Sequence, residues 1–148
     1  MDSRSSEPAE PAARGVGRVL KAVAQGALGA VLIVAGSSHL TSAREEFRAQ
    51  VPDWFPVDQD TVVVVSGVAE LTLGAALLAV WKQPWRHRLG LLVAAFFVAV
   101  FPGNVAQYLE HKDGFGLDTD AKRLARLPFQ VVLVAWAVLA TRQGRRNR

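Results

Sequence analysis

The chain has 148 residues, of which 51% are hydrophobic, and a formal net charge of +4. It contains no cysteine, which excludes disulfides, thiolate metal ligands, iron–sulfur clusters and dithiol redox chemistry, and we expect no metal site. The positive charge does not indicate a nucleic-acid partner, because the basic residues flank apolar blocks and serve better as topology signals.

Residues 1–18 are rich in Ser, Pro, Glu and Arg, which predicts a disordered tail. Four apolar blocks follow, at 22–40, 62–80, 89–108 and 127–140. The first three are long enough to cross a hydrocarbon core of about 30 Å as helices. The fourth is shorter, and it spans only if its polar neighbours lie at the membrane interface.

These blocks predict an all-α integral membrane protein, with a four-helix transmembrane domain at 19–141 and a basic tail at 142–148. Buried helices of a soluble protein are the alternative, but a chain this small cannot cover four helices that are apolar all round. The lipid bilayer is therefore the expected environment.

Lysine and arginine are concentrated in three places: the N-terminal segment, the short second connection and the C-terminal tail. We therefore expect a multi-pass protein of the cell membrane, and the positive-inside rule places both of its termini in the cytoplasm. Short connections favour an antiparallel bundle. Small residues at regular spacing predict close helix packing; they are Ala22, Gly26, Ala30, Gly29, Gly36, Gly67 and Gly74.

The first outer connection holds two prolines, Pro52 and Pro56, around an acidic residue and the aromatic Trp54 and Phe55. This composition suits a rigid turn on the membrane surface. It is either a plain interfacial anchor or a lid over a pocket.

Glu70 lies about 12 Å into the second block, where a carboxylate needs a partner, a proton or a function. Helix geometry places other polar side chains in the same half of the membrane. Gln130 is expected in the first turn of the last helix. The expected cluster comprises His39, Ser66, Glu70, Asn104, Gln107 and Gln130.

The cluster has two interpretations. The amides at 104, 107 and 130 serve either as glue between helices or as ligands in a cavity. In the third block, Pro102 frees a carbonyl near Val98, and Asn104, Gln107 and His111 are expected on one helix face beside this kink. Glu70 differs from the amides because it carries a charge, for which His39 or Arg126 is the expected partner.

Five short motifs, in and between the apolar blocks, resemble the DoxX-like family of small four-helix membrane proteins. They are Gly36-Ser-Ser-His39, Pro52–Trp54–Pro56, Ser66-Gly-Val-Ala-Glu70, Phe101-Pro-Gly-Asn104 and Arg126-Leu-Pro-Phe-Gln130. The chain departs from the family pattern at Leu40, where an aromatic residue is more usual, and at Gln107, where an apolar residue is. The resemblance implies links to quinone-coupled sulfur oxidation or to membrane oxidoreductase complexes that handle oxidative stress.

Three functions are compatible with these observations. The first is an accessory or binding subunit whose outer-leaflet pocket takes a small lipophilic or redox partner, with other membrane or redox proteins as its protein partners. The second is a subunit of a quinone-dependent oxidoreductase, in which Glu70 and His39 are the catalytic candidates and quinone is the cofactor. The third is a small transporter or proton relay. The expected ligand-binding residues are His39, Ser66, Glu70, Asn104, Gln107, Gln130 and Trp54.

Overall fold

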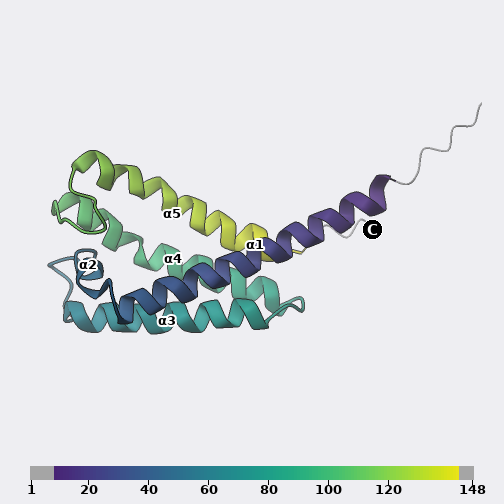
Figure 1. Ribbon diagram of the computed structural model, residues 1–148, viewed down its shortest axis with the longest axis horizontal. Coiled ribbons are helices and arrows are strands. Elements are labelled where there is room, and N and C mark those ends of the chain that lie inside the picture. The colour runs from purple at the N-terminus through teal and green to yellow at the C-terminus, as the bar shows by residue number, and fades with distance from the viewer. Residues whose placement is uncertain (1–8, 144–148) are drawn as a thin grey trace, which may run out of the picture.

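The computed structural model describes residues 9–143, and these form helices and connections without any strand (Figure 1). The helices in chain order are α1 (Ala9–Leu40), α2 (Arg44–Arg48), α3 (Gln59–Ala79), α4 (Trp85–Leu109) and α5 (Asp120–Thr141). Four of them, α1, α3, α4 and α5, are long and apolar enough to cross a membrane. The all-helical prediction and the four long helices are thus confirmed.

All four long helices begin before their apolar blocks, and α1 and α5 begin earliest relative to theirs. α1 starts at Ala9, so residues 9–18 are helical, contrary to the disordered tail expected at 1–18; residues 1–8 lie outside the described part of the chain. The alanines near this end favour helix. α5 starts at Asp120, where the Thr119 side chain accepts from the backbone N–H of Lys122. Gln130 therefore lies in the middle of α5, and the prediction of its first turn was wrong.

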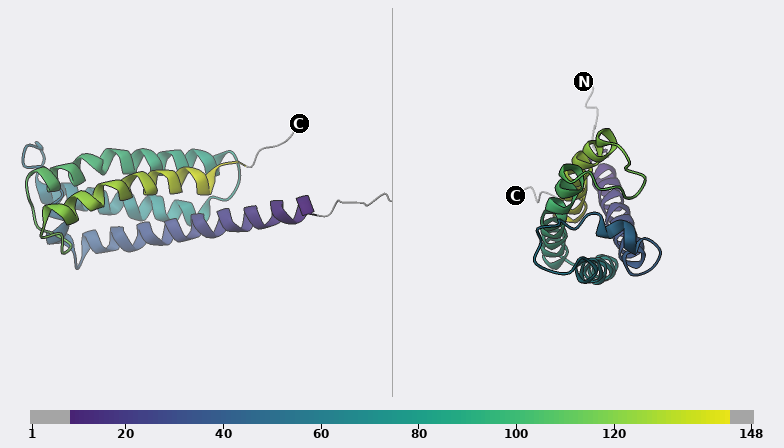
Figure 2. Two further views of the ribbon diagram at one scale, coloured as in Figure 1. Left: turned by 90° about the horizontal axis from the view of Figure 1, so that it is seen from above. Right: turned by 90° about the vertical axis from the view of Figure 1, so that its left-hand side faces the viewer.

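The long helices associate mainly as two pairs, α1 with α3 and α4 with α5. Contacts between α1 and α5 join the pairs on one side, whereas α3 and α4 touch little although a short turn connects them (Figure 2). The buried core lies between the pairs and includes Leu28, Leu32, Leu77, Val93 and Phe97. The two long connections, 41–58 and 110–119, meet at one end of the molecule, hereafter the loop end.

Glycines let α1 and α3 approach to backbone contact. A methyl group built on Gly36 would lie 2.6 Å from the Gly67 carbonyl oxygen, and one built on Gly74 would lie 2.8 Å from that of Gly29. The close packing predicted for these four glycines is confirmed. A methyl group built on Gly26 would meet nothing within 4 Å, so the close packing predicted from the spacing of Gly26 was wrong.

The end opposite the loops is tied by a buried polar network. The Gln25 amide donates to the carbonyls of Leu77 and Val80 at 2.7 and 2.9 Å, and its oxygen accepts from Arg86. Arg86 in turn donates to the Ala140 carbonyl at 2.8 Å. One amide and one guanidinium thus join all four long helices. The sequence analysis passed over Gln25, although it is a polar residue within an apolar block.

We predict that Gly67→Ala destabilises the protein by about 1–3 kcal/mol, because the added methyl would lie 2.7 Å from the His39 Cβ and force α1 and α3 apart. Thermal unfolding in detergent measures the effect. Gly26→Ala is the matched control: its methyl meets nothing within 4 Å, and its midpoint should stay equal or rise slightly. Equal midpoints for the two variants would contradict the role given to Gly67.

Candidate ligand-binding site

A cavity of about 540 Å³ opens at the loop end, between the two helix pairs. Apolar side chains of all four long helices line it, among them Leu32, Val63, Phe97 and Leu133. Polar and aromatic side chains line it as well, from the helices and from the loops. A mostly apolar lining with a few polar groups is the usual character of a small-molecule site.

His39 and Glu70 form a pair on the α1–α3 side of the cavity. His39 Nδ1 lies 3.0 Å from Glu70 Oε2 and 2.8 Å from the Ala35 carbonyl oxygen, and both side chains are about nine-tenths buried. This carbonyl takes the imidazole N–H, so Oε2 has no hydrogen-bond donor among the described residues. Of the two partners expected for Glu70, the structure selects His39. Gly67 brings the helices close enough for this contact, one turn before Glu70.

Aromatic rings stack against this pair from the two loops. Phe47, from α2, stacks on the His39 ring at a centroid distance of 3.3 Å, and Phe115 meets Phe47 edge-on at 4.6 Å. Phe115 has a φ of 55°, a region that bulky residues rarely adopt. Its N–H donates to Glu46 at 2.5 Å, which holds this backbone in place. The strained conformation therefore places a ring on the cavity wall.

α2 is fastened to the start of α3 by charge. Arg44 Nε donates to Asp60 at 2.6 Å, and Arg48 Nη2 donates to the same carboxylate at 2.6 Å. These bonds raise the pKa of both arginines above its ordinary value. The sequence analysis did not predict α2, whose function in the fold is to present Phe47 to His39.

The facing wall contains an amide chain between α4 and α5. Asn104 Nδ2 donates to Gln130 Oε1 at 3.1 Å, and Gln130 Nε2 donates to the Phe97 carbonyl. That carbonyl lies one residue from the position expected to be freed by Pro102. Three of the four polar groups of these two amides take part in this chain of bonds, which favours the interpretation as glue between the helices.

Arg126 reaches the cavity from α5 and is held by neutral groups. Its Nη1 donates to Gln107 Oε1 at 3.3 Å, and its guanidinium lies 5.2 Å from the Phe115 ring centroid. With the Gln50 amide oriented so that its oxygen faces the arginine, that oxygen accepts from both terminal nitrogens at 2.8 Å. The guanidinium thus donates to the amide oxygens of Gln107 and Gln50. The Nε2 of Gln107 is buried and has no hydrogen-bond partner among the described residues.

The proline-flanked turn covers part of the cavity. Pro52, Trp54 and Phe55 all line it, as a lid would, while Trp54 also remains 69% exposed. Lys112 fastens this turn by donating to Asp53 at 2.6 Å and to the Val51 carbonyl at 2.8 Å. The lining contacts favour the lid, and the surface anchor stays a prediction for the exposed ring of Trp54.

Lys112 also pairs with Glu110 at 2.8 Å, so it bridges two carboxylates. Burial lowers the pKa of Lys112, but its hydrogen bonds to Asp53 and Glu110 outweigh burial and raise the pKa above the ordinary value. The ammonium consequently stays charged throughout the neutral range, and the fastening of the turn persists there.

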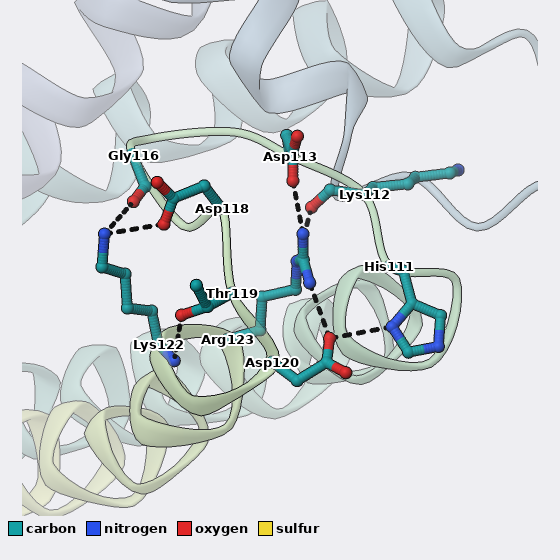
Figure 3. Close-up of polar contacts among 9 residues, drawn as sticks. All are labelled: His111, Lys112, Asp113, Gly116, Asp118, Thr119, Asp120, Lys122 and Arg123. Atoms are coloured by element: carbon teal, nitrogen blue, oxygen red, sulfur yellow. Dashed lines mark hydrogen bonds and ion pairs between the residues drawn. The ribbon is translucent and has the colours of Figure 1, made fainter.

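The second connection is fastened to the start of α5 by ion pairs (Figure 3). Arg123 donates to Asp113, to Asp120 at 2.6 Å and to the Lys112 carbonyl at 3.1 Å. His111 pairs with Asp120 at 2.8 Å and lies beyond the end of α4, so it does not share a helix face with Asn104 as expected.

Nearby, Lys122 pairs with Asp118 at 2.7 Å and lowers the pKa of that carboxyl. These bonds hold the chain on both sides of Phe115 and Gly116, the two residues with positive φ in the middle of the connection.

The structure brings most of the expected site residues to one cavity: His39, Ser66, Glu70, Asn104, Gln130 and Trp54. Gln107 stands behind the wall, in contact with Arg126. Phe47, Gln50 and Phe115 also line the cavity but were not predicted from the sequence, where Arg126 was expected as part of a family motif and as a partner for Glu70. Among the described residues, no three His, Asp or Glu side chains gather where they would hold a metal ion.

The fold is that of an all-helical protein with four candidate membrane spans and a cavity at one end. Residues 28–141 match a family described as a domain of unknown function (DUF8561), and the chain belongs to this family. No curated protein and no solved structure matches the chain.

We predict that Lys112→Met frees the turn at 51–57, because two carboxylates would then face each other without the ammonium between them. Amide hydrogen exchange over these residues should accelerate several-fold. Lys122→Met is the matched control, since Lys122 bonds only within 116–118. The same exchange rate at 51–57 in both variants would show that Lys112 does not fasten the turn.

Proposed function

We propose that this is a multi-pass membrane protein that binds a small lipophilic molecule in the cavity at the loop end. Its four long helices would cross the cell membrane as an antiparallel bundle, with both termini in the cytoplasm. The outward surfaces of these helices support insertion: Val65 on α3 and Val131 on α5 are 62% and 70% exposed in the isolated chain. Such residues would cost free energy in water and none in lipid.

One observation carries the binding function: the cavity is enclosed largely by apolar side chains, yet it has His39, Glu70 and Arg126 on its walls. Glue between helices would need no open volume and no charge. A site that binds an apolar body and orients it by a few polar groups needs both. The protein would act as a binding or accessory subunit, consistent with the predicted resemblance to DoxX-like proteins.

The orientation is tested by single cysteines, since the chain has none of its own. We predict that Val57→Cys, at the loop end, reacts with a membrane-impermeant maleimide added outside intact cells. Gln143→Cys, at the other end, should react only after the membrane is opened. If Gln143→Cys alone is labelled in intact cells, the protein has the opposite orientation. If both variants are labelled, the two ends do not lie on opposite sides of the membrane, and the proposed orientation is wrong.

The binding function is tested by filling the cavity. We predict that the wild-type protein, purified in mild detergent, yields a co-purified lipophile on extraction with organic solvent, and that Ser66→Phe reduces its amount at least tenfold. Ser66 lines the cavity, so a phenyl ring there would occupy the space of the ligand. Mass spectrometry of the extracts measures the difference.

Ser37→Phe is the matched control, because Ser37 is exposed on α1 and its hydroxyl bonds only to its own helix. It should retain the lipophile at the wild-type level. Equal extraction from Ser66→Phe and wild type would contradict binding in this cavity, and so would an extract without any stoichiometric lipophile.

A quinone is the second candidate, as the ligand of an oxidoreductase subunit. The specific observation is that a pair able to exchange a proton, His39 with Glu70, faces the cavity from α1 and α3, while Arg126 faces it from α5. A ring between them would have a hydrogen-bonding group on each side. A quinone absorbance spectrum in the wild-type extract supports this function, and a lipophile without one argues against it.

A further inference from the structure

Arg126 differs from every other cation at the loop end. Five arginines and lysines there are each paired with at least one carboxylate: Arg44, Arg48, Lys112, Lys122 and Arg123. Arg126 has no carboxylate within ion-pair distance among the described residues, and of these six cations only Arg126 lines the cavity. Glu70, on the other side of the cavity, lies beside His39 instead, with Oε2 3.0 Å from Nδ1.

This arrangement leaves one positive charge without a counter-charge at a half-buried position. Amide oxygens of Gln50 and Gln107 satisfy hydrogen-bond donors of the guanidinium, but they do not neutralise its charge. A charge in this environment is costly unless an opposite charge is close. The neighbouring chain has carboxylates in abundance, and none is placed on Arg126. The missing charge is therefore expected to come with the ligand.

A second groove continues from the cavity along the little-contacted seam between α3 and α4. Its walls are Ala69, Thr72 and Leu73 on α3 and Leu92, Ala95 and Ala99 on α4, and Ala99 also lines the cavity. The Thr72 hydroxyl bonds to the Val68 carbonyl of its own helix, so it presents no free polar group. From Ala99 to Leu92 the groove follows α4 for about 10 Å, from the middle of the helix toward the end opposite the loops.

We infer that the cavity binds a single-chain amphiphile whose anionic head pairs with Arg126 and whose apolar tail lies in the groove between α3 and α4. This inference rests on the proposed binding function and specifies the class of ligand. The charge of the head follows from Arg126. One tail is what the groove between α3 and α4 accommodates. Entry would be sideways from the bilayer, because the groove is open along the seam.

Three probes separate head from tail: oleic acid, oleyl alcohol with the same chain and no charge, and butyric acid with the same head and a short chain. Binding to the full chain in a non-ionic detergent is measured by calorimetry at pH 8. Oleate should bind at least tenfold more tightly than the alcohol, and butyrate should bind weakly. A two-chain phospholipid with an anionic head, phosphatidylglycerol, should bind less tightly than oleate.

Variants assign the two parts to their residues. Arg126→Gln should abolish the preference for oleate over the alcohol, and Arg126→Lys should keep part of it, which also controls for folding. Ala95→Trp fills the groove and should weaken oleate at least tenfold without changing butyrate. Ala135→Trp, on an exposed position of α5, is its matched control and should bind oleate as the wild type does.

The outcomes distinguish this inference from the proposed function. Equal binding of oleate and oleyl alcohol to the wild type, or an unchanged preference in Arg126→Gln, would overturn the anionic head while leaving the cavity a lipophile site. Tighter binding of phosphatidylglycerol than of oleate would overturn the single tail. If no probe binds and Ser66→Phe extracts match wild type, the binding function itself fails.

Discussion

The close contact of α1 with α3 is the constraint on which the candidate site depends. Two pairs of glycines, Gly29 with Gly74 and Gly36 with Gly67, bring the two backbones together. His39 and Glu70 each lie three residues beyond the second pair, and at this separation their side chains meet at 3.0 Å. With larger residues at the crossing, the carboxyl would face the cavity without its histidine. Because α3 packs on α1, it has few contacts with α4, and the seam between α3 and α4 is open.

The long helices could be predicted because apolar blocks of membrane-spanning length have few alternative structures. Their ends could not be predicted from hydropathy alone. α5 extends through Arg123 and Arg126 because Thr119 caps it and because both arginines find acceptors, Arg123 in the second connection and Arg126 on Gln107 of α4. A Thr-Asp pair ahead of a helix is a readable start signal, and it would have placed Gln130 correctly in the middle of α5.

The polar residues of the apolar blocks predicted much of the cavity, since helix rise places them at similar depth. The remaining wall comes from the connections, where contacts join residues far apart in sequence. Phe47 contacts His39 because a helix of five residues, held by Asp60, places it there. The position of Phe115 requires a positive φ, which the sequence does not predict. No periodic pattern marks such residues, because their positions are set by tertiary contacts alone.

The network of Gln25 and Arg86 differs from the loop end in the forces that hold it. Its bonds join a guanidinium and an amide to backbone carbonyls, out of reach of solvent ions for the most part. At the loop end, two of the ion pairs join exposed side chains, His111 with Asp120 and Lys122 with Asp118, and dissolved salt screens such pairs over about 8–10 Å at physiological strength. Ionic strength therefore acts on the end that covers the cavity, while the opposite end keeps the four helices joined.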